Sequence, residues 1–331
     1  MDTVHLIDSV TLSKSVEEMS INGYEPPQEY IVKDCRFGSI ESSPSLGSIP
    51  IIDISIFSLS SSHDPKEVEN ELEKLRSALS SAGCFQPLMT NYEIAANYIS
   101  DYKNLTRMIY GFKPIHPVLN QIPFEPQAIG HGIPSSLLDK IREAAKQFFA
   151  LPLEEKHKYS RAANEGEGYG HDVIVSEKQI LDWSSRLSLM VYPEDQRRLN
   201  LWPQNPTDFK DILNEYAEKL KGVTDILFKA IEKSLNLVEN SFSSQFGENP
   251  IMKIMSNGIF KSPLHRVLTN TEKLRISVAT FNEPEPDREI GPVDDLINEK
   301  RPRVYRNVKN FAAFNYECFQ KGKVALDEVK V

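Results

Sequence analysis

The sequence predicts an α+β fold, in which long amphipathic helices accompany a few short strands. Three stretches, at about 65–83, 135–152 and 207–236, carry apolar residues at helical spacing. Three others, at 49–54, 253–260 and 274–281, have the length and composition that are typical of strands. The 331 residues are 40% hydrophobic and 26% charged, which is the composition of a globular chain long enough to bury a core.

The first 48 residues are polar, and we expect them to form an arm over the folded body rather than a domain. The strand at 49–54 is β-branched and lies between Ser- and Gly-rich flanks. The next helix is expected to begin at Pro65, with Asp64 as its N-cap, and to end at Gly83. Its apolar face comprises Val68, Leu72, Leu75 and Leu79.

The second helix is expected from about Ser135 to Pro152, with Leu138, Ile141, Ala145 and Phe148 on its apolar face. The third, at 207–236, keeps helical spacing for about six turns, and Thr207 is its expected N-cap. Such a stripe indicates core packing rather than a cofactor site. Beyond Val293 the sequence predicts a short acidic helix and a second helix from Val308 to about Gln320.

Residues 87–127 differ from their surroundings in composition. Only six of the 41 are Asp, Glu, Lys or Arg, whereas four are Tyr and five are Pro. Helical spacing of apolar residues predicts a helix in the first half, from Ile94 to Ile109. From Gly111 on, four prolines rule out its continuation. We therefore expect a surface excursion made of one helix and a long irregular loop.

Charge and cysteine usage restrict the partners and the compartment. A net charge of −9 makes binding to nucleic acid or to an anionic membrane unfavourable. The three cysteines show no CxxC pair, as expected of reduced thiols in an intracellular protein. The first thirty residues lack the pattern of a signal peptide, and no run approaches the ~18 apolar residues of a membrane span. We expect a cytoplasmic monomer.

Common catalytic motifs are absent from the sequence. The seven histidines include no HExxH pair, and none is followed two positions later by Asp or Glu. His265 and Arg275 are spaced as on two strands joined by a turn at Thr269-Asn270. Strand alternation then puts Arg275 and Ser277 on one face, where a guanidinium and a hydroxyl suit a carboxylate.

At residues 254–281 the sequence resembles the plant 2-oxoglutarate- and Fe(II)-dependent dioxygenases, most closely the senescence-related, norcoclaurine-synthase-like and codeine-demethylase-like group. Collinear matches occur at 49–53, 130–134, 148–152, 168–170, 182–183, 201–203, 283–286, 290–293 and 301–305. The resemblance implies a helical N-terminal region followed by a double-stranded β-helix, or jelly roll. It also implies an enzyme that oxidises a small specialised metabolite. It further implies that Fe(II) is held by an HxD pair and a distal histidine. His265 matches the distal histidine. Arg275 and Ser277 match the residues that anchor 2-oxoglutarate.

The chain departs from this family at two places. The strands that carry the HxD pair are expected between Lys253 and Ile254, which here are adjacent, so the jelly roll is expected to be incomplete. The segment 87–127 interrupts what is one strand in the family. We therefore expect an arm at 1–48, an interrupted N-terminal region at 49–247 and a truncated core with C-terminal helices at 248–331. The hypothesis is an intron-retaining, exon-skipping transcript or a faulty gene model. We expect its product to have unpaired strand edges and to be aggregation-prone if expressed.

Three functions remain open from the sequence. The first is a family member with impaired or absent catalysis, in which no residue is assigned a catalytic role. The second is an active oxygenase that recruits other iron ligands, such as His171 or Asp172. The third is a non-catalytic protein that binds a partner or a small molecule.

Overall fold

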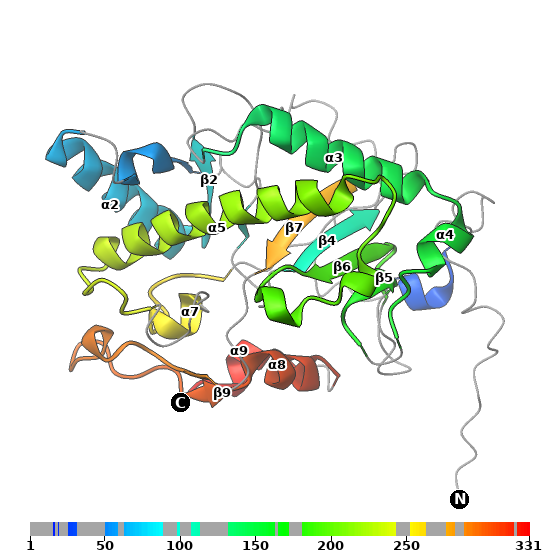
Figure 1. Cartoon of the computed structure of the whole chain (residues 1–331). Coiled ribbons are helices and arrows are strands. Elements are labelled where there is room, and N and C mark those ends of the chain that lie inside the picture. Colours follow the sequence, from blue (N-terminus) through cyan, green and yellow to red (C-terminus); the bar gives the residue numbers. More distant parts are fainter. Residues whose placement is uncertain are drawn as a thin grey trace, which may run out of the picture.

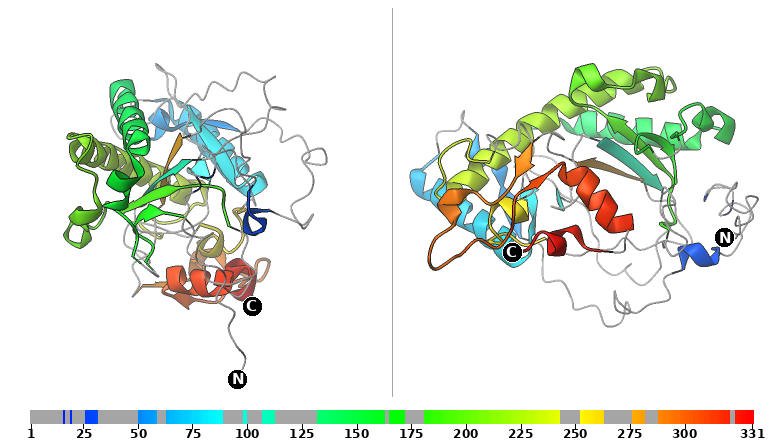
Figure 2. Two further views of the ribbon diagram at one scale, coloured as in Figure 1. Left: turned by 90° about the vertical axis from the view of Figure 1, so that its right-hand side faces the viewer. Right: turned by 90° about the horizontal axis from the view of Figure 1, so that it is seen from below.

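The computed structural model describes residues 16, 19, 26–31, 50–58, 63–88, 98–99, 107–112, 132–162, 165–171, 181–242, 252–262, 276–281, 288–320 and 323–331. A four-stranded sheet lies at the centre, with α3 (Ser135–Ala150) and α5 (Phe209–Ser234) packed along it (Figure 1). The C-terminal helices α8 (Phe311–Gln320) and α9 (Ala325–Glu328) lie on the side away from α3 (Figure 2). Within the described ranges, no helix combines the length and apolarity needed to cross a membrane.

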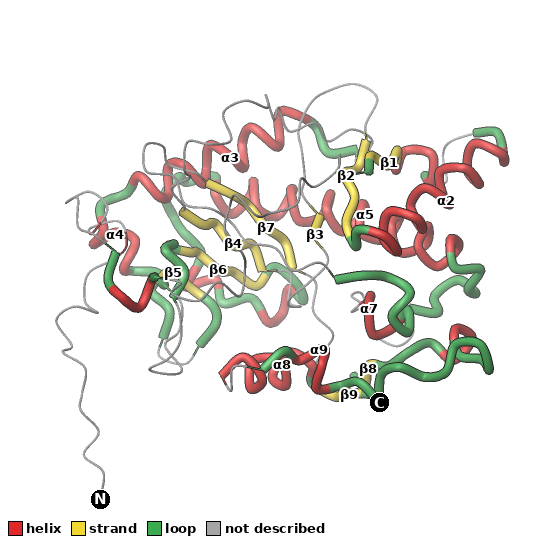
Figure 3. The backbone as a smooth tube through the Cα atoms, turned by 180° about the vertical axis from the view of Figure 1, so that it is seen from behind, coloured by secondary structure: helices red, strands yellow, loops and turns green. Residues whose placement is uncertain are grey.

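The central sheet has the strand order β5-β6-β4-β7, and every neighbouring pair is antiparallel (Figure 3). Its strands are β4 (Arg107–Phe112), β5 (Gly168–Gly170), β6 (Arg186–Met190) and β7 (Ile276–Phe281). The strand predicted at 274–281 is thus confirmed. The Gly-rich stretch 168–170 pairs with β6 as an edge strand.

The helix predicted from Ile94 to Ile109 is wrong, because the described parts of that segment are strands. β3 (Tyr98–Ile99) pairs with β2 (Cys84–Leu88), and β4 lies between β6 and β7. Tyr, Ile and Phe favour strands, and pairing along both edges outweighs a helical spacing made partly of weak helix formers. β4 pairs with both β6 and β7 along their facing edges. A jelly roll without its central strands would leave these edges open.

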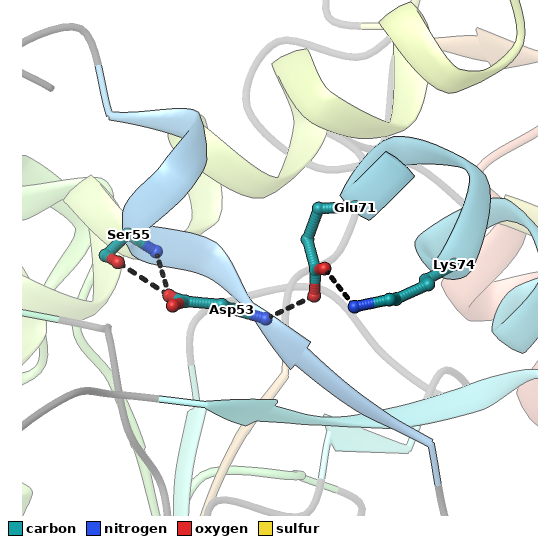
Figure 4. A network of polar contacts seen from close by, with 4 residues as sticks. All are labelled: Asp53, Ser55, Glu71 and Lys74. Carbon is teal, nitrogen blue, oxygen red and sulfur yellow. Dashed lines mark hydrogen bonds and ion pairs between the residues drawn. The ribbon is translucent and has the colours of Figure 1, made fainter. Parts of the chain in front are cut away.

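A second sheet has the order β1-β2-β3, in which β1 (Ile51–Asp53) runs parallel to β2. The strand predicted at 49–54 is therefore confirmed, and it turns directly into the 3-10 segment Ile54–Phe57. The buried Glu71 of α2 (Pro65–Ser81) joins this strand to the helix (Figure 4). Its carboxylate accepts the backbone N–H of Asp53 at 2.8 Å and the Lys74 ammonium at 2.6 Å. The Asp53 carboxylate in turn accepts from the N–H and hydroxyl of Ser55.

The long helices follow the predicted boundaries closely. Asp64 caps α2 by accepting the Lys66 N–H at 2.9 Å, and Gly83 follows the helix end with a φ of 74°. The third predicted helix is α5, although its N-cap is Asp208 rather than Thr207. Phe148 of α3 is fully buried, and its ring contacts those of Phe149, Tyr159, Tyr169 and Phe209. This aromatic cluster joins α3, α5 and the sheet into one core.

The strand predicted at 253–260 is wrong. Here the chain forms the short helix α7 (Met252–Met255), and Asn257 and Gly258 then reverse its direction with φ values of 50° and 79°. Such left-handed backbone conformations do not occur within a strand. The Asn257 side chain holds the reversal by accepting the Val304 N–H at 2.8 Å and donating to the Pro302 carbonyl at 3.0 Å.

The remaining described elements are short. They are the 3-10 segments Gln28–Tyr30, Glu194–Gln196, Leu199–Leu201 and Asp294–Leu296, the helix α4 (Leu153–His157), and the paired strands β8 (Glu289–Ile290) and β9 (Val308–Lys309). The acidic helix predicted after Val293 is the 3-10 segment at 294–296. The last predicted helix is α8, preceded by β9.

Candidate functional site

The two faces of the central sheet have different characters. Leu187, Leu189 and Tyr169 are buried, and the Tyr169 ring meets Phe148 of α3 at a centroid distance of 5.8 Å. Alternation along β6 puts Arg186, Ser188 and Met190 on the opposite face. The register puts Ser277, Ala279 and Phe281 of β7 on that same face. We call this second surface the polar face, because Arg186 and two serines lie on it, although Ser188 is buried and Met190, Ala279 and Phe281 are apolar.

Ser277 is the predicted site residue that the structure describes. It is half-buried in β7, on the polar face. Through Gly111 of β4, Ser277 lies in register with Arg186 of β6. His265, Arg275 and the turn at 269–270 belong to the segment 263–275, which lies outside the described residues. Their predicted roles stay predictions.

Arg186 is the functional candidate that sequence reasoning missed. Its guanidinium forms an ion pair with Asp182, and its side chain is 24% exposed. Ser184, just upstream, is 1% exposed, and its hydroxyl has no hydrogen-bond partner. Arg186 and Ser188 have the two-residue spacing of a strand, and this alternation was visible in the sequence, whereas Ser184 lies before β6 begins. It carried no weight there because the strand next to Arg186 was unknown.

The described residues do not form a metal site. No three His, Cys, Asp or Glu side chains within those ranges come together as metal ligation requires. The His171 ring nitrogen Nδ1 is 3.3 Å from the Ser184 carbonyl oxygen, and the His171 carbonyl accepts from Arg161 Nη1 at 3.1 Å. Asp172, the other substitute ligand considered, lies outside the described residues. Among the described residues, His171 therefore has no neighbouring side chains that would complete an iron centre.

Gly168 in β5 is expected to tolerate no side chain. Its φ is 113°, and a Cβ there would lie 2.9 Å from the Tyr159 carbonyl oxygen and from the backbone of Arg161. We expect Gly168→Ala to lower the free energy of unfolding by about 2–4 kcal/mol, from strain and overpacking together. Urea unfolding measures this. Gly222→Ala in α5 is the control, because nothing lies within 4 Å of that Cβ and alanine favours a helix by about 0.5–1 kcal/mol. Equal effects of the two changes would contradict the expectation.

Comparison with known proteins shows which protein family this chain resembles. Residues 126–205 match the family "non-haem dioxygenase in morphine synthesis N-terminal", and residues 222–284 match the "2OG-Fe(II) oxygenase superfamily". Codeine O-demethylase of Papaver somniferum is 28% identical over 246 positions, covering 54% of this chain and 68% of the relative. S-norcoclaurine synthase 1 of Coptis japonica is 27% identical over 271 positions, covering 62% and 77%.

The resemblance to the 2-oxoglutarate- and Fe(II)-dependent oxygenases that was found in the sequence is therefore confirmed. Solved structures agree on the fold. The structure of JOX2, a complex with 2OG, Fe and JA, superposes with a TM-score of 0.69 at 19% identity, over 96% of this chain and 98% of that one. A 2OG-Fe(II) oxygenase family protein from Caulobacter crescentus gives 0.57 at 15% identity, over 84% and 100%. These enzymes have the jelly-roll fold.

The alignments also show an imbalance in length. The 246 positions shared with codeine O-demethylase use 54% of 331 residues, or about 179, so roughly 67 positions are filled only in the relative. The 271 positions shared with S-norcoclaurine synthase 1 use 62%, or about 205 residues, which leaves roughly 66. Two relatives thus give nearly the same shortfall.

Proposed function

We propose that this chain is a member of the oxygenase family without iron-dependent catalysis, produced from an altered transcript or gene model. The observation that carries the proposal is the absence of any HxD or HxE sequence from the whole chain. The shortfall of roughly 67 positions against codeine O-demethylase supports it, because a segment of this size is enough to carry the missing strands and ligands.

The local structure at the proposed junction supports the same conclusion. Lys253 and Ile254 are consecutive residues of the single helical turn α7. Ile254 is fully buried, and the Met255 carbonyl accepts the Val293 N–H at 3.0 Å. The described residues of this turn pack as core and present no iron ligand. An incomplete jelly roll, with domain limits as expected from the sequence, is part of the proposal.

The remaining residues do not fit the iron centre that the family implies. His265 is one of three expected ligands, and Arg275 with Ser277 corresponds to the carboxylate anchor of 2-oxoglutarate. Loss of a residue that only supports a ligand already costs ~10–100-fold in affinity or activity. Loss of two direct ligands is expected to cost more, so we derive no reaction step through iron here.

A second candidate function is non-catalytic binding of a small molecule by a cytoplasmic monomer. The specific observation in its favour is the polar face, where Arg186 and Ser277 lie in register across a glycine. The relatives include codeine O-demethylase, S-norcoclaurine synthase 1 and a flavonol synthase/flavanone 3-hydroxylase, whose names refer to small metabolites. We propose a ligand of comparable size.

Succinate release tests the loss of catalysis. The full chain is incubated with Fe(II), 2-oxoglutarate and oxygen, with codeine O-demethylase and its substrate as positive control. We expect succinate at the no-protein background. Succinate above background that disappears with a chelator would overturn the proposal. The variants His265→Ala and His171→Ala would then show which histidine supports the activity.

A further inference from the structure

We propose that Asn257 is a deamidation site that the fold protects, and that its conversion to an acid loosens the C-terminal segment from α7. The C-terminal segment is the described part of the chain from 288 onward, at 288–320 and 323–331. The inference goes beyond the loss of catalysis and does not depend on it, since deamidation consumes only water.

The chemistry of the site lies in the dipeptide Asn257-Gly258. The Gly258 backbone nitrogen attacks the side-chain carbonyl carbon of Asn257, and the side-chain nitrogen leaves as ammonia with the Gly258 proton. Water then opens the cyclic imide at either carbonyl, which gives aspartate or its β-linked isomer. Asparagine is among the labile residues of proteins, and a following glycine favours the reaction because no side chain hinders the attack. The sequence contains one other such pair, Asn22-Gly23.

Three features of the folded chain hold this reaction back. Asn257 is only 3% exposed, so water has little access to it. The Gly258 N–H donates to the Lys253 carbonyl at 2.8 Å, which occupies the attacking nitrogen. Both polar atoms of the Asn257 amide are engaged, by the Val304 N–H at 2.8 Å and the Pro302 carbonyl at 3.0 Å. Ring closure must break these bonds, so we expect deamidation to require local opening.

The opening that exposes Asn257 is a separation of the C-terminal segment from α7, which lies beside it (Figure 1). Pro302 and Val304, the two partners of the Asn257 amide, belong to this segment. A third bond across the same contact runs from the Val293 N–H to the Met255 carbonyl at 3.0 Å. The Val304 carbonyl also accepts the Val331 N–H at 2.9 Å, which extends the link to the last residue.

The product of deamidation fits the closed turn less well than asparagine does. An aspartate at 257 can still accept the Val304 N–H, but it leaves the Pro302 carbonyl without a donor. It also carries a negative charge at a buried position, and both effects raise the free energy of the closed form. The β-linked isomer adds a carbon to the main chain and displaces the Gly258 N–H from Lys253. Conversion therefore makes the opening harder to reverse.

Peptide mass spectrometry measures the protection. The full chain is incubated in mildly alkaline buffer with and without guanidinium chloride and is then digested with trypsin. Cleavage after Lys14, Lys33, Lys253 and Lys261 puts Asn22 and Asn257 in separate peptides. In denaturant we expect the two sites to convert at similar rates. In native buffer Asn257 is expected to convert at least about tenfold more slowly than in denaturant, because the rate follows the population of the open form. Equal rates in the two buffers, or no conversion in denaturant, would overturn the proposal.

Val293→Pro tests which contact controls the opening. Val293 has a φ of −64° and a ψ of 128°, which proline can adopt, but proline cannot donate to the Met255 carbonyl. A buried carbonyl left unpaired is expected to raise the open population, and with it the native deamidation rate of Asn257, about tenfold. The rate in denaturant is the control and is expected to stay unchanged. An unchanged native rate would show that the C-terminal segment does not control access to Asn257.

Asn257→Asp tests the consequence of the reaction. Hydrogen exchange in the C-terminal segment is expected to become about tenfold faster, while exchange in α3 stays at the parent rate. Asn236→Asp is the matched control, because Asn236 also has a positive φ, of 56°, but is exposed. It is expected to leave exchange in the C-terminal segment unchanged. Parent-like exchange in Asn257→Asp, or equal acceleration by the two variants, would overturn the role of Asn257 in holding this segment.

Discussion

Ile109→Pro in β4 is expected to abolish the folded state. The residue lies in the middle of the central sheet, opposite Ser188 of β6 and Ala279 of β7. Proline lacks the N–H that a central strand must donate and is found essentially only at sheet edges. Since native domains are stable by only about 5–15 kcal/mol, a broken ladder at this position opens the facing edges of both neighbours. Circular dichroism and size-exclusion chromatography should show loss of the cooperative melt and aggregation.

Ile109→Val is the matched control, because valine keeps the backbone N–H and favours strands. It is expected to melt as the parent chain does. A cooperative melt of the proline variant, unchanged from the parent, would mean that β4 does not hold the sheet together.

A chain lacking 87–127 tests whether this segment is part of the fold or foreign to it. Aggregation is expected if β4 has become part of the fold, whereas greater solubility would mark the segment as foreign to it.

Local signals predicted the helices well. Asp64 and Pro65 define the start of α2, and the apolar spacing along 209–234 defines α5, because capping and amphipathicity are properties of neighbouring residues. β1 and β7 were likewise visible as short apolar runs bounded by polar flanks. These elements depend little on what the rest of the chain does.

Elements that depend on distant partners were mistaken. β4 is a strand because β6 and β7 pair with it from residues about eighty and about one hundred and seventy positions away. The C-terminal end of α7 is fixed by Val293, whose N–H bonds to the Met255 carbonyl, and the reversal that follows is held by Asn257, which binds the backbone at Val304. The same limit applies to the candidate site. Ser277 was found from its neighbour Arg275, whereas Arg186 became a candidate through a register that one sequence does not display.

We propose that the insertion of 87–127 and the loss of strands next to Lys253 are coupled. β4 occupies the space between β6 and β7, and restored strands would compete with it for the edges of the core. Each change alone is therefore expected to harm the fold more than both together, which is the behaviour of sites that share contacts. A repaired chain must lose residues 87–127 and regain the segment of roughly 67 positions that codeine O-demethylase has and this chain lacks.

This repaired chain is expected to release succinate from 2-oxoglutarate with Fe(II) and oxygen, more than about 100-fold above the present chain, since even a lost supporting residue costs ~10–100-fold. The same graft with alanine in place of its HxD histidine and aspartate is the control for folding without iron ligands. His265→Ala in the active graft tests the third ligand and is expected to return succinate to background. A graft that folds and melts cooperatively but makes no succinate would mean that the missing segment is not what separates this chain from an oxygenase. Activity that survives His265→Ala would move the third ligand to another residue and leave the loss of the HxD pair as the whole cause of inactivity.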